Sequence, residues 1–116
     1  MVSGQELFIE RDAIKKSLKT SIDKAYGNGV HYADKMRSYR IILRQTMLRL
    51  EAEGAKATTL KDIAKGDEDV AQAEFDMIVA EVAYKASHEN IMAQKKLLDS
   101  IEADIKREYY KGVEDG

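Results

Sequence analysis

Apolar side chains recur at every seventh residue in the last third of the chain. This heptad ridge consists of Val70, Met77, Tyr84, Ile91, Leu98 and Ile105. A straight α-helix drifts about 20° per heptad away from such a line, so an unbroken repeat of seven is typical of a helix that coils around another helix. Acids at positions 67–69 favour a helix start there, because carboxylates stabilise the free N–H groups of a first turn. The pattern predicts one long helix over residues 67–110.

Two further helical patterns occupy the first half of the chain. In the first, apolar residues are spaced by three, four or seven positions. They are Leu7, Ile14, Leu18, Ile22 and Ala25. Ser3 and Glu6 form a capping-box pattern ahead of them. The second pattern repeats every seven residues, at Met36, Leu43 and Leu50. Gly27–Gly29 lies between the two, and its glycines accept a positive φ that ends a helix. We expect helices over residues 5–26 and 30–53.

A connector without a long apolar pattern joins the second and third predicted helices. It covers residues 54–66, begins and ends with glycine, and contains Leu60 and Ile63, which can form one short amphipathic turn. The chain has no proline, and residues that favour helices dominate its composition. The sequence therefore predicts one all-α domain over residues 1–116, a helical hairpin or bundle with one long heptad-patterned C-terminal helix.

The heptad ridge needs a covering helix, and the sequence offers two sources. The first half of the long helix carries a second apolar face, which the two N-terminal helices can cover. This face consists of Phe75, Ile78, Val79, Val82 and Ala86. The ridge then remains for a second copy, so we expect a homo-oligomer with the ridge residues at its interface. The alternative is a monomeric up-down bundle, in which the N-terminal helices cover the ridge.

Cysteine and hydropathy place the protein in a reducing, aqueous compartment. The chain has no cysteine, which excludes disulfides and thiolate metal sites. It shows no pattern of an export signal, and no apolar stretch approaches the ~20 residues that cross a bilayer. We expect a cytoplasmic protein without membrane contact.

Charge is distributed unevenly, although the net charge is only -2. Residues 11–65 contain 13 lysines and arginines and 6 acids, whereas residues 66–116 contain 6 and 13. The basic half is suited to an anionic partner such as nucleic acid. It is equally suited to pairing with the acidic half, within one subunit or between subunits.

No residue pattern indicates catalysis. The chain lacks the glycine-rich motifs that bind nucleotide phosphates, and neither His31 nor His88 has a second histidine or a cysteine at metal-ligand spacing. Paired acids on the predicted helices are expected to be solvated, because 34% of the residues are charged. We expect no enzyme activity, no metal and no cofactor.

The basic residues form stripes that can follow a phosphate backbone. One stripe is Arg11, Lys15 and Lys19, and another is Arg37, Arg40 and Arg44. Tyr32 or Tyr39 can offer a stacking surface to an unpaired base. The connector carries Lys56, Lys61 and Lys65, which are free to turn outward because the connector has little apolar surface. The candidate nucleic-acid contacts are Lys56, Lys61, Lys65, Arg37, Arg40, Arg44 and Arg49.

The order of these elements resembles the UvsY-type recombination mediators of phages, over residues 28–110. The resemblance is carried by the segment 47–52, by 30–32 before it, and by the start of the long helix at Asp69 and Val70. It implies helical subunits that form a ring-like oligomer, bind single-stranded DNA and help load a RecA-like recombinase onto strands covered by single-strand-binding protein. It also implies a phage protein acting in the host cytoplasm. The DNA-contacting segment of that family has Leu-Lys followed two residues later by arginine. Here Leu60 and Lys61 match, and Ile63 stands in place of the arginine.

The function hypothesis is therefore a phage-type recombination mediator that binds single-stranded DNA through its basic half. One alternative is a scaffolding or assembly protein, in which the charges serve only subunit pairing. Another is an adaptor or inhibitor that docks on one host protein through the heptad ridge. In that case the chain alone would be monomeric or poorly folded.

Overall fold

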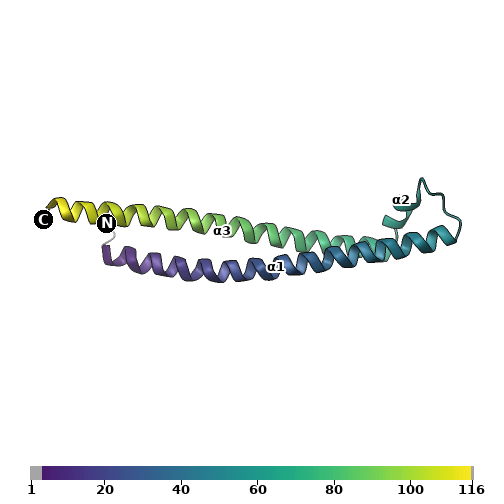
Figure 1. Ribbon diagram of the computed structural model, residues 1–116, viewed down its shortest axis with the longest axis horizontal. Helices are drawn as coiled ribbons and strands as arrows, with labels where there is room; N and C mark the ends of the chain where they lie inside the picture. Colours follow the sequence, from purple (N-terminus) through teal and green to yellow (C-terminus); the bar gives the residue numbers. More distant parts are fainter. Residues whose placement is uncertain (1–3, 116) are drawn as a thin grey trace. The chain divides into compact units, whose positions relative to one another are not determined.

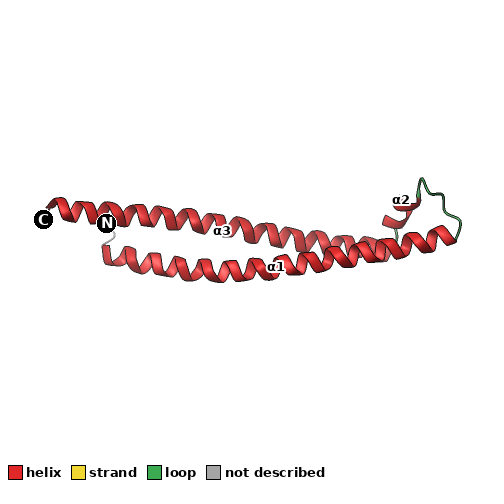
Figure 2. Cartoon of the chain, viewed as in Figure 1, coloured by secondary structure: helices red, strands yellow, loops and turns green. Residues whose placement is uncertain are grey.

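Three helices make up the part of the chain that the structure describes. The computed structural model describes residues 4–115, with side chains for residues 4–111. Helix α1 spans Gly4–Ala52, α2 spans Leu60–Lys65 and α3 spans Glu68–Asp115 (Figure 1). No strand occurs within residues 4–115 (Figure 2). The predicted all-α class with one long C-terminal helix is confirmed. The proposed Ser3 cap lies outside the described residues.

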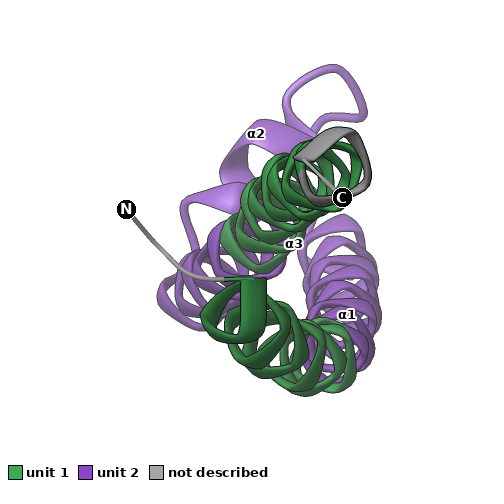
Figure 3. Cartoon of the chain, turned by 90° about the vertical axis from the view of Figure 1, so that its left-hand side faces the viewer, with its two compact units in different colours: residues 1–25, 86–116 green, residues 26–85 purple. Residues whose placement is uncertain are grey.

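The chain divides into two compact units, where the sequence predicted a single domain. Unit 1 comprises Met1–Ala25 and Ala86–Gly116, and unit 2 comprises Tyr26–Lys85 (Figure 3). Helices α1 and α3 contribute to both units. In unit 1, Ser21 on α1 accepts hydrogen bonds from the side chains of Asn90 (3.1 Å) and Gln94 (2.9 Å) on α3.

In unit 2, α1 and α3 also lie side by side and run in opposite directions. Tyr32 contacts Glu81, and Arg49, further along α1, contacts Asp67 just before α3. The side chain of Asp67 accepts hydrogen bonds from the backbone N–H groups of Asp69 (3.0 Å) and Val70 (3.4 Å). These bonds satisfy free donors of the first turn. The predicted start of the long helix is confirmed, and α3 continues beyond the expected end at residue 110.

The predicted helix break at Gly27–Gly29 is wrong, because α1 runs through it. Within the described residues only Gly54, after the end of α1, has a positive φ, at 95°. Gly29 lies close to the Tyr84 ring instead. A Cβ atom at this position would lie 3.0 Å from Cε1 of the Tyr84 ring. Tertiary packing thus outweighs the cost of about 1 kcal/mol that each glycine imposes on a helix interior.

Gly27→Ala is expected to raise the free energy of unfolding by about 0.5–1 kcal/mol. A Cβ atom at position 27 meets no atom within 4 Å, so only the better helix propensity of alanine is felt. Urea unfolding followed by circular dichroism measures the change. Gly29→Ala is the control and should gain less, because its new methyl group meets Tyr84. A loss of stability in Gly27→Ala would mean that the chain does leave the helix here.

The heptad ridge is covered by α1 of the same chain. Val70 and Ile91 are buried, and Met77, Tyr84, Leu98 and Ile105 are half-buried. Coverage of the ridge by an N-terminal helix is what the alternative of a monomeric up-down bundle predicted. The expectation that N-terminal helices cover the second apolar face of α3 is wrong. Phe75, Ile78, Val79 and Val82 are between 48% and 61% exposed, and Ala86 is also exposed. A single helix has one stripe for its partner, and α1 uses that stripe on the ridge. The prediction of a ridge-mediated oligomer stays a prediction.

The connector contains the short helix that its apolar residues predicted. Leu60 and Ala64 of α2 are buried, whereas Ile63 is 49% exposed. The inward face is therefore formed by residues four apart, rather than by the pair that the sequence suggested. None of the described helices is both long enough and apolar enough to span a membrane.

Candidate nucleic-acid interface

The three lysines of the connector lie at the surface of unit 2. Lys56, Lys61 and Lys65 are exposed. Lys61 and Lys65 are four residues apart on α2, so they occupy one side of that helix. The burial of Leu60 and Ala64 holds α2 in place and leaves this side to the solvent.

A turn positions Lys56 ahead of α2. The carbonyl oxygen of Lys56 accepts hydrogen bonds from the backbone N–H (3.1 Å) and from the hydroxyl (3.4 Å) of Thr59. Residues 54–66 contain these three lysines and one acid, Asp62, which gives the segment a charge of +2. Within the described side chains, no carboxylate lies at ion-pair distance from any of the three lysines. This is the arrangement that phosphate groups require, with cations exposed and not already neutralised.

Arg49 does not belong to this free group. Its guanidinium donates to Glu53 (3.4 Å) and to Asp67 (3.1 Å), the acids that flank the connector on either side. Such exposed pairs contribute about 0–1 kcal/mol to stability. Their effect here is mainly local. Arg49 neutralises two carboxylates that would otherwise repel a phosphate near the lysines.

Arg37, Arg40 and Arg44 line a groove of about 440 Å³ on α1 of unit 2. Its lining also includes the apolar residues Ala33, Met36 and Ile41, and all three arginines are exposed. Arg37 pairs with Asp34 at 2.6 Å, one turn earlier on α1. Arg40 and Arg44 form no ion pair with any described carboxylate. In the described part of the chain, these arginines therefore do not pair with the acidic α3.

Tyr32 and Tyr39, the candidate stacking residues, are half-buried and hydrogen-bonded to α3 through their hydroxyl groups. The hydroxyl of Tyr32 donates to Glu81 of α3 at 2.9 Å, and Lys85 lies 2.7 Å from the same carboxylate. The Tyr32 bond raises the pKa of the tyrosine, and the hydrogen bond from Lys85, followed by that from Tyr32, lowers the pKa of Glu81. A hydrogen bond to Glu74 raises the pKa of Tyr39 to about 12. The hydroxyl groups of both tyrosines are thus engaged by acids of α3.

The basic stripe predicted in unit 1 is incomplete. Lys15 and Lys19 are exposed, but the side chain of Arg11 is 28% exposed and its guanidinium lies 4.9 Å from the centre of the Phe8 ring. The Nε atom of Arg11 is buried without a hydrogen-bond partner. Arg11 lies 14 residues, or about four helical turns, before the buried Ala25, so the two residues are on the same side of α1. Arg11 therefore faces the buried side of α1 and is not available to a ligand.

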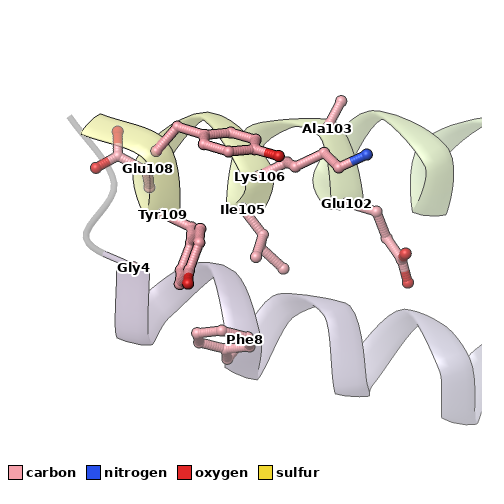
Figure 4. A pocket seen from close by; sticks show the side chains of 9 residues that line it. Gly4, Phe8, Glu102, Ala103, Ile105, Lys106, Glu108 and Tyr109 are labelled. Carbon is pink, nitrogen blue, oxygen red and sulfur yellow. The ribbon is translucent and has the colours of Figure 1, made fainter. Parts of the chain in front are cut away.

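An apolar groove lies in unit 1 between the start of α1 and the last turns of α3. It measures about 850 Å³ and is lined by Phe8, Ile105, Tyr109 and Tyr110 among others. Figure 4 shows Ile105 and Tyr109 pointing from α3 toward Phe8 on α1. Its charged lining residues include both signs, with Glu102 and Lys106, so it does not attract an anion selectively.

The described side chains contain no cluster suited to a metal ion, in the sense of three or more histidine, cysteine or acidic groups placed together. His31 and His88 are both exposed, on different helices. What the site can do is bind an anion with the connector lysines.

Comparisons of this chain with protein families, with curated proteins and with solved structures find no match.

Proposed function

We propose that the protein is a recombination mediator that binds single-stranded DNA through the connector of unit 2. The observation that carries the proposal is the set of Lys56, Lys61 and Lys65, which are exposed and free of ion pairs among the described side chains. The primary contacts are these lysines. Arg40 and Arg44 are less suited to this role, because their groove is also lined by apolar side chains, which phosphates do not need.

The choice of single-stranded over duplex DNA as the ligand rests on the resemblance of residues 28–110 to UvsY-type mediators. The same resemblance supplies the partners, a RecA-like recombinase and a single-strand-binding protein, and the location, the host cytoplasm during phage infection. No chemical step is involved. The protein acts by holding the strand, and an oligomer would multiply weak lysine contacts into useful avidity.

Binding should weaken steeply with salt, because each neutralised phosphate releases counterions. Fluorescence anisotropy with a labelled oligo-dT strand measures this. We expect binding at ~50 mM salt and a slope of log affinity against log salt near -2 for one subunit, since three contacts contribute about 0.7 each on single strands. Absence of binding at this salt, or binding indifferent to salt, would reject the proposal.

A scaffolding or adaptor role is the second candidate, and one observation favours it. Phe75, Ile78, Val79 and Val82 form an exposed apolar face on α3. Contiguous exposed apolar surface of this kind marks protein contacts rather than nucleic-acid contacts. In the scaffolding case the charges serve subunit pairing, so reversing the charges of Lys56, Lys61 and Lys65 would disrupt the oligomer, whereas an intact oligomer that no longer binds DNA favours the mediator.

A further inference from the structure

Unit 2 carries an exposed apolar stripe on α3, formed by Phe75, Ile78, Val79 and Val82. These residues are spaced by three, one and three positions, so they lie on one side of the helix. Phe75 and Val82 are each 61% exposed. Leaving four large apolar side chains in water is unfavourable, by an amount that grows with the apolar area, at ~25 cal/mol per Å². Burial of the α3 stripe against a protein partner is therefore more favourable than its exposure to water.

The groove on α1 offers a surface of similar length in the same unit. Its apolar lining residues Ala33, Met36 and Ile41 extend over nine positions of sequence, at spacings of three and five. The α3 stripe extends over eight, from Phe75 to Val82. A helix laid along such a groove makes contact once per turn, which is how one helix recognises another.

The charges around the two surfaces are opposite. Arg37, Arg40 and Arg44 border the groove. The α3 stripe is accompanied on its own helix by Glu68, Asp69 and Asp76. The nearest cation beyond it, Lys85, is held by Glu81 at 2.7 Å. We propose that the α3 stripe of one copy of this chain docks into the arginine groove of a second copy.

A copy cannot satisfy its own two surfaces. The inner sides of α1 and α3 in unit 2 face each other, as the contact between Tyr32 and Glu81 and the tilted pair of Tyr32 and Tyr84 rings, 6.1 Å apart, demonstrate. The stripe lies on the other side of α3, where its residues are 48–61% exposed, so the groove of the same copy does not cover it. Each copy therefore offers both a groove and a stripe to other copies. This contact is heterologous, so it joins copies head to tail instead of pairing them about a two-fold axis.

The assembly goes beyond the proposed DNA binding and stands without it. It assigns Arg40 and Arg44 to contacts between subunits, which leaves the connector lysines for an anion. Because its readout is mass in the absence of nucleic acid, failure of DNA binding would not count against it.

The test compares three forms of the full chain by size-exclusion chromatography with light scattering at micromolar concentration. The stripe variant is Phe75→Ser with Val82→Ser, and the groove variant is Arg40→Glu with Arg44→Glu. All four residues are exposed, so the fold is expected to persist, and circular dichroism checks this. The wild type should have at least twice the chain mass of 13.1 kDa, and each variant alone should have the monomer mass.

Mixing the two variants gives the sharpest result. The stripe variant keeps an intact groove and the groove variant keeps an intact stripe, so a one-to-one mixture should form a dimer that cannot grow. Lys15→Glu with Lys19→Glu, an equally exposed pair four residues apart, is the matched control and should keep the wild-type mass. Should a double variant lose helix content, Val82→Ser and Arg44→Gln carry the same comparison.

Three outcomes would overturn the proposal. One is a monomeric wild type. Another is a pair of monomeric variants that do not combine when mixed. The third is a groove variant that keeps the wild-type mass and loses affinity for oligo-dT, which would make the groove a nucleic-acid contact.

Discussion

Replacement of Lys56, Lys61 and Lys65 by alanine is expected to lower the affinity for a single-stranded oligonucleotide at least about tenfold at ~50 mM salt. The three side chains are exposed, and no described carboxylate pairs with them, so their removal costs no internal contact. The dependence on salt should also become shallower by about 2 in the logarithmic slope, because three phosphate contacts are lost. Anisotropy titrations at several salt concentrations measure both quantities.

The control must remove the same charge elsewhere. Lys16, Lys95 and Lys96 are also exposed and lie in unit 1. Their replacement by alanine changes the net charge equally and should alter the affinity less than about twofold, because surface charges that do not contact the strand are largely screened. Equal losses in the two triple variants would show that binding follows net charge alone. The connector would then have no special role.

Val70→Asp should destabilise the protein by about 3–5 kcal/mol, the range for an unpaired charge placed in a core. Val70 is fully buried where α3 begins, one turn after the Asp67 cap. Total stabilities of small domains are only about 5–15 kcal/mol, so this loss should be visible as a large fall in melting temperature. Thermal unfolding followed at 222 nm measures it.

Val79→Asp is the matched comparison, since it makes the same chemical change on the same helix. Val79 is 51% exposed, so its carboxylate stays hydrated and the melting temperature should change little at low protein concentration. Similar losses in both variants would mean that the outer side of α3 is also covered in the folded chain.

Sequence periodicity predicted α3 well and α1 only in part. The ridge of α3 is made of apolar residues at one heptad position, so the pattern and the covered surface coincide. On α1 the covered position also recurs every seven residues, but it includes Arg11, Tyr32 and Thr46. Because polar side chains interrupt the apolar repeat at this position, the hydrophobic pattern does not show that α1 is one continuous helix. The glycines between the two apparent patterns then suggested a break that the packing of Tyr84 removes.

The sequence predicted which side chains of the candidate site are exposed to solvent. It did not predict which of them form ion pairs or hydrogen bonds with residues elsewhere in the chain. Lysines in a connector with few apolar residues are solvent-exposed in almost any fold. Lys56, Lys61 and Lys65 are indeed exposed in the structure. The ion pair of Arg49 with Glu53 follows from helical spacing, since the two residues are four positions apart. The ion pair of Arg49 with Asp67 joins residues 18 positions apart, which spacing alone does not reveal. The hydrogen bonds of the Tyr32 and Tyr39 hydroxyl groups were missed for the same reason, because their acidic partners lie on a different helix.

The close approach of Gly29 to the Tyr84 ring couples two positions that are distant in sequence. A methyl group at position 29 would lie 3.0 Å from the ring, so the ring must give by a few tenths of an ångström, and a larger side chain needs more room than that. Evolutionary exchanges that place a residue larger than alanine at position 29 should therefore be accompanied by a smaller residue at position 84. Among divergent descendants of this chain, the two positions should covary.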